Sequence, residues 1–167
     1  MYEYKPSVKK TREKLVATMA FVLAALAFCA ASAFRLRYLF VYQFLGAICL
    51  MIGVTVVTRY LMRSYRYRLA PSDGFGGETM DFSVIESYAG RVRTVCRISL
   101  SDIVEVSYLQ RENQKALRAE QRGKCVYYYV EEMKPRGLCL LSVRDGEETL
   151  FVQIVADERL YLLLKSH

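Results

Sequence analysis

The chain has 167 residues, of which 53% are hydrophobic, and a formal net charge of +7 from 24 Lys and Arg against 17 Asp and Glu. Such a basic balance is common among nucleic-acid-binding proteins, which carry their positive charge on the folded domain. Here the excess lies beside two apolar segments, and residues 69–167 carry a net charge of −2. This distribution argues against a nucleic-acid partner.

The first 64 residues predict a membrane anchor. After a basic tail over residues 1–14, two runs without charged side chains, Leu15 to Phe34 and Tyr38 to Thr58, are separated only by residues 35–37. A helix of 20 residues is about 30 Å long, which is the thickness of the hydrocarbon core of a bilayer. We therefore expect a two-helix transmembrane hairpin within residues 15–64, with the lipid bilayer as its surroundings.

The charges that flank these runs predict the orientation of the hairpin. Five basic residues precede the first run and four, between residues 59 and 68, follow the second, whereas the connecting loop holds Arg35 and Arg37. Basic residues are enriched in cytoplasmic segments. We therefore expect a multi-pass protein of the cell membrane with both termini in the cytoplasm.

A cleaved signal peptide is the alternative for the first run, because Ala31-Ser32-Ala33 resembles a small-residue cleavage site. The apolar stretch is longer than the 7–15 residues of a typical signal core. Cleavage there also leaves a new N-terminus only about four residues before the second run. These two features favour the uncleaved hairpin.

Small side chains recur at helical spacing in both runs. The first run has an alanine seam, and the second has small residues at matching steps of three and four. Small residues let membrane helices approach closely, so we expect these two faces to pack antiparallel while the Phe, Leu, Met and Val side chains meet lipid. The seam is formed by Ala17, Ala20, Ala24, Ala27 and Ala31, and the facing residues are Gly46, Cys49 and Gly53.

Gln43 is the strongly polar side chain of the second run. It is placed to bond across the hairpin, to bond a partner helix, or to extend toward the headgroups. Neither run contains an ionisable residue, so the hairpin lacks the features of a proton or ion pathway.

From Ser64 onward the hydrophobic period changes toward two, which is typical of strands. We expect a cytoplasmic β domain over residues 65–167, ending in a helix over 158–165 that Asp157 caps. Antiparallel strands with short turns form a sandwich or a partly open barrel, and a terminal helix can close one end of it. The expected strands cover residues 64–70, 80–88, 91–98, 103–109, 124–132, 138–144 and 148–155.

The order of seven strands and one terminal helix, together with several short segments, resembles the bacterial pleckstrin-homology-like (PH-like) domains. The segments are Tyr65 to Leu69, Asp81 to Ile85, the pair Gly90-Arg91, and Ile98 to Val106. Such domains commonly follow a pair of transmembrane helices. The resemblance implies an antiparallel seven-stranded PH-like sandwich or partly open barrel and a role in interaction.

One departure limits what this resemblance implies about ligands. Phosphoinositide-binding members of the family carry basic side chains in the loop between their first two strands. The corresponding loop here, Pro71 to Thr79, contains Asp73 and Glu78 and no Lys or Arg. The resemblance therefore does not extend to headgroup binding through this loop.

The residues needed for catalysis or metal binding are not arranged in a recognisable pattern. The single histidine is His167, and the five cysteines include no Cys-x-x-Cys pair. The segment Gly74 to Gly77 lacks the Lys-Ser/Thr of a phosphate-binding loop. We therefore expect a protein that is not an enzyme and that has no catalytic residues, metal site or cofactor.

Two basic segments are candidate binding surfaces. We expect several arginines to form one basic strand face that could contact anionic headgroups, although an ordinary solvated face is the simpler interpretation. The second segment, Arg111 to Lys124, is either a solvated connection or a docking element. The face would comprise Arg91, Arg93 and Arg97, with Arg66 and Arg68 beside them.

These observations leave two functional hypotheses open. The first is a non-enzymatic scaffold, in which a membrane-anchored PH-like module binds a protein partner or self-associates at the cytoplasmic face. The second is a sensor that responds to lipid or ligand through the basic strand face.

Overall fold

The structure is a computed structural model, and it describes residues 1–33, 39–72, 79–109, 124–133, 135, 137–146 and 148–166. The chain divides into two compact units. One unit consists of residues 8–64, and the other combines residues 1–7 with residues 65–167.

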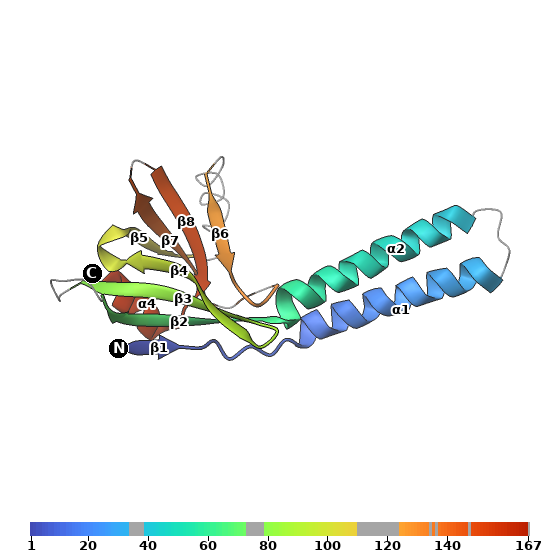
Figure 1. The fold of residues 1–167 in the computed structure, drawn as a ribbon, viewed down its shortest axis with the longest axis horizontal. Coiled ribbons are helices and arrows are strands. Elements are labelled where there is room, and N and C mark those ends of the chain that lie inside the picture. The colour runs from blue at the N-terminus through green and yellow to red at the C-terminus, as the bar shows by residue number, and fades with distance from the viewer. Residues whose placement is uncertain are drawn as a thin grey trace. The chain divides into compact units, whose positions relative to one another are not determined.

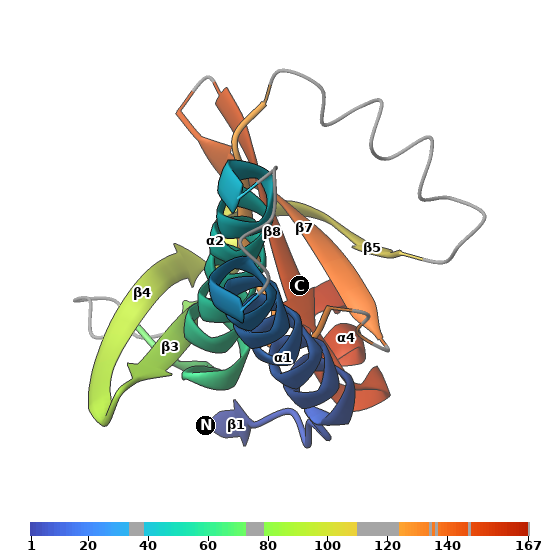
Figure 2. The same cartoon turned by 90° about the vertical axis from the view of Figure 1, so that its right-hand side faces the viewer.

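The first unit is a helical hairpin. Helix α1 (Thr11–Ala33) and helix α2 (Leu39–Val56) lie side by side in both views (Figures 1 and 2), and α2 continues into the π-helical segment η1 (Val57–Leu61). By length and composition, Thr11–Ser32 and Leu39–Leu61 are each able to cross a membrane. The coarse prediction of a helical hairpin followed by a β-rich module is therefore confirmed.

The described residues of the second unit form two four-stranded sheets, which a C-terminal helix follows (Figure 1). The first sheet has the order β1-β2-β3-β4, and its strands are Tyr2–Tyr4, Arg63–Pro71, Met80–Tyr88 and Arg91–Ser99. The 3₁₀ turn η2 (Leu100–Asp102) leads into the second sheet, which has the order β5-β7-β8-β6. Its strands are β5 (Ile103–Tyr108), β6 (Val126–Tyr129), β7 (Leu138–Asp145) and β8 (Glu148–Val155), and helix α4 (Glu158–Lys165) follows them.

Two features of the expected sheet architecture are wrong. The described residues form eight strands rather than seven, and β6 pairs with β8 in parallel, in the register Val126↔Phe151 to Tyr129↔Ile154. The apolar pattern of β6 predicted a strand correctly. A strand pattern does not specify the neighbour, and a parallel partner is joined through a long connection rather than a tight turn.

The additional strand comes from the tail that we expected over residues 1–14. Strand β1 is antiparallel to β2, with Tyr2 opposite Leu69 and Tyr4 opposite Tyr67. Its two tyrosines pack against the buried side of β2, whereas Glu3 lies on the other side and contacts Arg66. Three residues are too few to show the alternation that predicts a strand.

The core lies between the two sheets. Its fully buried side chains come from both sheets and from α4, where Leu160 is buried completely. The carboxylate of Asp157 caps α4 by accepting a hydrogen bond from the Leu160 amide at 2.8 Å, as the sequence predicts. The largest of these side chains are Tyr67, Phe82, Leu141, Ile154 and Leu160.

The β3–β4 hairpin turns through Ala89 and Gly90, which both have positive φ, at 48° and 82°. Two consecutive residues of this kind form the tight turn that matches the twist of neighbouring strands. This turn directs β4 back along β3 as the edge of the first sheet.

Several expected features lie wholly or largely outside the described residues. These are the loop residues Arg35 and Arg37, most of the Pro71 to Thr79 loop, most of the Arg111 to Lys124 segment, and His167.

Candidate functional site

The five arginines expected to form one basic face do not share a face. In the β3–β4 pairing Val84 lies opposite Cys96 and Ile85 lies opposite Thr94, so Val95 is an extra residue in β4. Such a bulge reverses the alternation of the residues that follow it. The expectation that Arg93 and Arg97 point to the same side is therefore wrong.

The pairing assigns each arginine to a side of the sheet. Arg93 lies opposite Glu86, on the same side as the buried residues Phe82 and Val84. Arg97 lies opposite Ser83, on the other side. Arg91 shares the side of Arg93, whereas Arg66 and Arg68 alternate with buried residues of β2 and point away from the core.

Most of these arginines contact acidic or neutral groups of the module. The Arg97 Nε lies 2.8 Å from Asp81 Oδ2, and Arg66 Nη1 lies 3.6 Å from Glu3 Oε1. Arg68 Nη2 lies 3.7 Å from the sulfur of Met1. The five arginines are therefore divided between the two sides of the first sheet, and Arg66, Arg68 and Arg97 already contact groups of the module.

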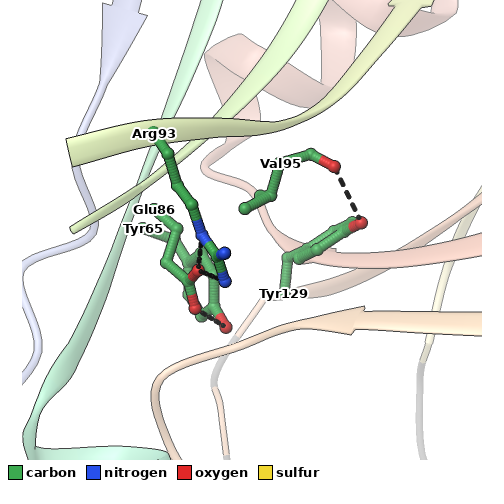
Figure 3. Close-up of polar contacts among 5 residues, drawn as sticks. All are labelled: Tyr65, Glu86, Arg93, Val95 and Tyr129. Carbon is green, nitrogen blue, oxygen red and sulfur yellow. Dashed lines mark hydrogen bonds and ion pairs between the residues drawn. The ribbon is translucent and has the colours of Figure 1, made fainter. Parts of the chain in front are cut away.

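The most tightly organised contact joins Glu86 and Arg93 (Figure 3). Arg93 approaches Glu86 Oε2 with Nη2 at 2.7 Å and Nε at 2.8 Å. The Glu86 side chain is 3% exposed, whereas the Arg93 side chain is 70% exposed. A buried carboxylate requires a partner, so Glu86 holds the arginine at the surface in a fixed position.

Tyrosines from two strands complete this site. The Tyr65 hydroxyl donates to Glu86 Oε1 at 3.4 Å, and its ring makes a T-shaped contact with that of Tyr129 of β6, with ring centroids 5.8 Å apart. The Tyr129 hydroxyl donates to the carbonyl of Val95, the bulge residue, at 3.5 Å (Figure 3). We call Tyr65, Glu86, Arg93, Val95 and Tyr129 the Glu86–Arg93 cluster.

Burial controls the protonation of the groups around this cluster. It raises the pKa of the Tyr129 phenol to about 12, and it also raises the pKa of the nearby Cys96 thiol. Both groups are therefore neutral at physiological pH, and neither is an activated nucleophile.

The cluster is suited to binding rather than to proton transfer. A guanidinium held through one edge can present its remaining N–H groups to a carboxylate or phosphate. Arg93 lies on an edge strand beside Val92, which is 66% exposed. Among the described residues, no group of three His, Cys, Asp or Glu side chains could hold a metal ion.

The structure also locates the small residues of the hairpin. The five alanines of the seam are between 2% and 9% exposed, Gly46 and Gly53 are buried, and Cys49 is half-buried. A Cβ atom at Gly46 would lie 3.1 Å from the ring of Phe28, and one at Gly53 would lie 3.1 Å from the ring of Phe21.

The rings of Phe21 and Phe28, which we expected to meet lipid, therefore also lie against the glycines of α2. Glycine leaves a recess on α2, and a ring from α1 lies over each one. Both rings stay partly exposed, at 37% and 41%. The two rings therefore lie next to the alanine seam on α1 and cover the glycines of α2.

Glu13 is a buried residue of the hairpin that the apolar pattern did not reveal. It is 3% exposed and precedes Ala17 by four residues, which continues the spacing of the alanine seam. Near the same end of the hairpin, the Lys10 ammonium donates to the carbonyl of Arg63 at 2.6 Å. The four-residue step from Glu13 to Ala17 was a signal available in the sequence.

Comparison of the chain with protein-family models, curated proteins and solved structures finds no match.

Proposed function

We propose that this protein is a non-enzymatic, membrane-anchored scaffold that binds a partner protein through the β4 edge of its β module. The observation that carries the proposal is the Glu86–Arg93 contact, which fixes a largely exposed arginine on an exposed edge strand. Arginine is enriched among the residues that dominate the energy of protein interfaces.

Two observations support an anchor that enters and leaves the membrane on one side. The helices of the hairpin are long and apolar enough to span a bilayer. Strand β1 precedes the hairpin, and it is hydrogen-bonded to β2, which follows it. The positive-inside bias favours the cytoplasm as that side, so the proposed protein is multi-pass, with the module and both termini cytoplasmic.

A PH-like fold of the module is also part of the proposal. The two four-stranded sheets and the C-terminal helix α4 support this classification. The parallel β6–β8 pair and the strand β1 depart from the expected all-antiparallel arrangement of seven strands. The resemblance therefore supports an interaction role through its general architecture.

The chemistry of β4 indicates what kind of partner fits. Its residues Arg91 to Thr94 are exposed, and an edge strand offers unpaired backbone groups to an incoming extended segment. Arg91 and Arg93 favour acidic side chains on that segment. Two copies of β4 paired with each other would bring arginines together, which disfavours self-pairing at this edge.

Site-specific photo-cross-linking in native membranes tests this proposal. We expect a photoreactive residue in place of Val92 in the full chain to form a protein adduct, and Arg91→Glu to reduce its yield. Leu162 of α4 is a matched control position because it is 57% exposed and apolar. Arg144→Glu, on exposed Arg144 of β7, is the control for charge reversal.

The same experiment separates the scaffold from the sensor hypothesis. Adducts to lipid alone at position 92, weakened by Arg91→Glu, would support the sensor. Equal protein adducts at positions 92 and 162, or an effect of Arg144→Glu as large as that of Arg91→Glu, would contradict binding at the β4 edge.

A further inference from the structure

The edges of the two sheets carry different charges. Each sheet of the described structure has four strands, so the edges are β1 and β4 in the first sheet and β5 and β6 in the second. Strand β4 begins with Arg91 and Arg93, whereas β5 contains Glu105 and follows Asp102 directly. Strand β6 has no charged residue, and Glu3 of β1 already contacts an arginine of β2. The acidic edge that complements the basic β4 edge is therefore β5.

The β5 edge presents its carboxylate in a fixed orientation. The Ser107 hydroxyl donates to Glu105 Oε1 at 2.9 Å. Both Asp102 and Glu105 are exposed, and Val104 between them is 58% exposed. A carboxylate accepts through two oxygens, so Glu105 can also accept from a guanidinium.

The β4 edge has the same design with the opposite charge. Val92 is 66% exposed and lies between Arg91 and Arg93, and the buried carboxylate of Glu86 holds Arg93 in place. Each edge therefore presents one highly exposed valine beside charged side chains, of which one is held by a hydrogen bond.

The two edges of one copy do not pair with each other. They belong to different sheets, and neither has a hydrogen-bonded neighbour on its outer side among the described strands. Figure 2 shows β4 and β5 on opposite sides of the module. One copy can therefore offer its β4 edge and its β5 edge to two different neighbours.

The charges also determine which edges of two copies can meet. Like charges placed opposite each other destabilise paired strands, whereas opposite charges stabilise them, so β4 against β5 is favoured over either edge against itself. The register of β5 shifts between Ile103 and Glu105, and such a shift limits a regular ladder to a few residues. The contact therefore consists of ion pairs and apolar packing over a short segment.

We propose that the partner of the β4 edge is the β5 edge of a second copy of this chain, with Arg91 and Arg93 facing Asp102 and Glu105, and Val92 packed on Val104. The inference rests on the proposed function, and it names the partner. Because each copy contributes two different edges, the contact is heterologous and builds rings or rows of modules.

Photo-cross-linking between two distinguishable copies tests the contact. The full chain is co-expressed with two different C-terminal tags, and a photoreactive residue replaces Val92 in one of the two forms. We expect an adduct that carries both tags and whose second site maps to residues 102–106. The same photoreactive residue at Leu162, which is also apolar and exposed, is the matched control and should not form this adduct.

Charge reversal on the two edges gives a second readout. Arg91→Glu or Glu105→Arg in every copy should lower the yield of the two-tag adduct roughly 1.5- to 5-fold, the range expected for one cross-strand charge pair. Both changes in the same chain should restore the yield, which a merely structural effect of either change would not do. Glu148→Arg, at an exposed acid of β8, is the control and should leave the yield unchanged.

The outcomes separate this inference from the proposed function. Protein adducts at position 92 that never contain a second copy overturn the inference and leave the scaffold intact, whereas the absence of any protein adduct there contradicts both. A two-tag adduct that the single reversals leave unchanged, or that the combined reversal does not restore, also overturns the inference.

Discussion

The hydroxyl of Tyr67 holds the two sheets of the module together. It donates to the Tyr129 carbonyl of β6 at 2.7 Å and accepts from the Val155 amide of β8 at 3.2 Å. Its ring is fully buried and stacks on Phe82 and Tyr4. One residue of β2 therefore satisfies backbone groups at the ends of both members of the parallel pair.

Replacing Tyr67 with Phe tests this role. The variant leaves a carbonyl and an amide without their partner inside the module, and we expect a loss of about 1–3 kcal/mol in the free energy of unfolding. Chemical denaturation of the full chain measures the change. Tyr128→Phe is the control, since Tyr128 is 53% exposed, and its change should stay within about 0.5 kcal/mol.

Buried phenols and thiols also predict how stability depends on pH. Burial raises the pKa of Cys139 and of Tyr129 to about 12 each, and raises that of Tyr67 as well. A raised pKa means that the folded state keeps protons that the unfolded state has released. Stability is therefore complete below the ordinary pKa values of about 8.5 for Cys and 10 for Tyr.

We expect the module to lose stability progressively from about pH 8.5 toward pH 12. Denaturation curves of the full chain across this range, with tyrosinate absorbance followed in parallel, measure the loss. Cys139→Ala should make stability less dependent on pH near pH 8.5, because it removes the group with the lowest ordinary pKa. A stability that stays constant or rises up to pH 12 would contradict the burial of these groups.

At the scale of the element, the hairpin packs through two kinds of contact. Alanines of α1 form a buried seam, and glycines of α2 accommodate the rings of Phe21 and Phe28. The small alanines permit close packing of the two helices, and each glycine leaves room for a ring of the other helix.

Enlarging a buried small residue should therefore loosen the hairpin. We expect Ala24→Leu and Gly53→Leu each to destabilise it by about 1–3 kcal/mol, because a larger side chain overpacks the interface. Thermal unfolding in detergent, monitored by helical circular dichroism, measures the effect. Ala25→Leu is the control on the exposed side of α1, and an equal response of all three variants would contradict the packing described.

The bulge in β4 is the second element-scale feature with consequences for function. Val95 is the extra residue, and its carbonyl accepts a hydrogen bond from Tyr129. Because the bulge reverses the alternation, Arg93 lies beside Glu86 and Arg97 beside Asp81, on opposite sides of the sheet. The bulge thereby separates charges that a regular strand would align.

At the scale of the whole molecule, residues on both sides of the hairpin in sequence form one sheet. Strand β1 pairs with β2, and the Tyr2 hydroxyl also donates to the Asp157 carboxylate, the cap of α4, at 3.3 Å. The N-terminal residues are therefore a structural part of the β module, because they supply the strand that pairs with β2.

Deleting residues 2–4 tests this dependence. We expect lower thermal stability of the module and faster amide hydrogen exchange in β2, because β2 becomes an edge strand and Tyr67 loses the ring of Tyr4. Glu3→Ala is the control, since its ion pair with Arg66 is half exposed and such pairs contribute at most about 1 kcal/mol. Unchanged exchange in β2 after the deletion would contradict a structural role for β1.

Local patterns in the amino-acid sequence predicted the hairpin, most strands, the cap at Asp157 and the small residues between the helices. Each of these features depends on local periodicity or on hydropathy, and both are properties of residues that are neighbours in sequence. The sequence likewise indicated the excess of positive charge beside the apolar runs.

Which strands are neighbours, and where the arginines point, depends instead on long-range contacts that the sequence pattern does not specify. The parallel partner of β6, the pairing of β1 with β2 and the bulge at Val95 depend on contacts between residues that are distant in sequence, or on a one-residue shift that leaves no periodic signal. For that reason the site became a fixed Glu86–Arg93 contact at one edge of a sheet, rather than the continuous basic face that strict alternation predicts.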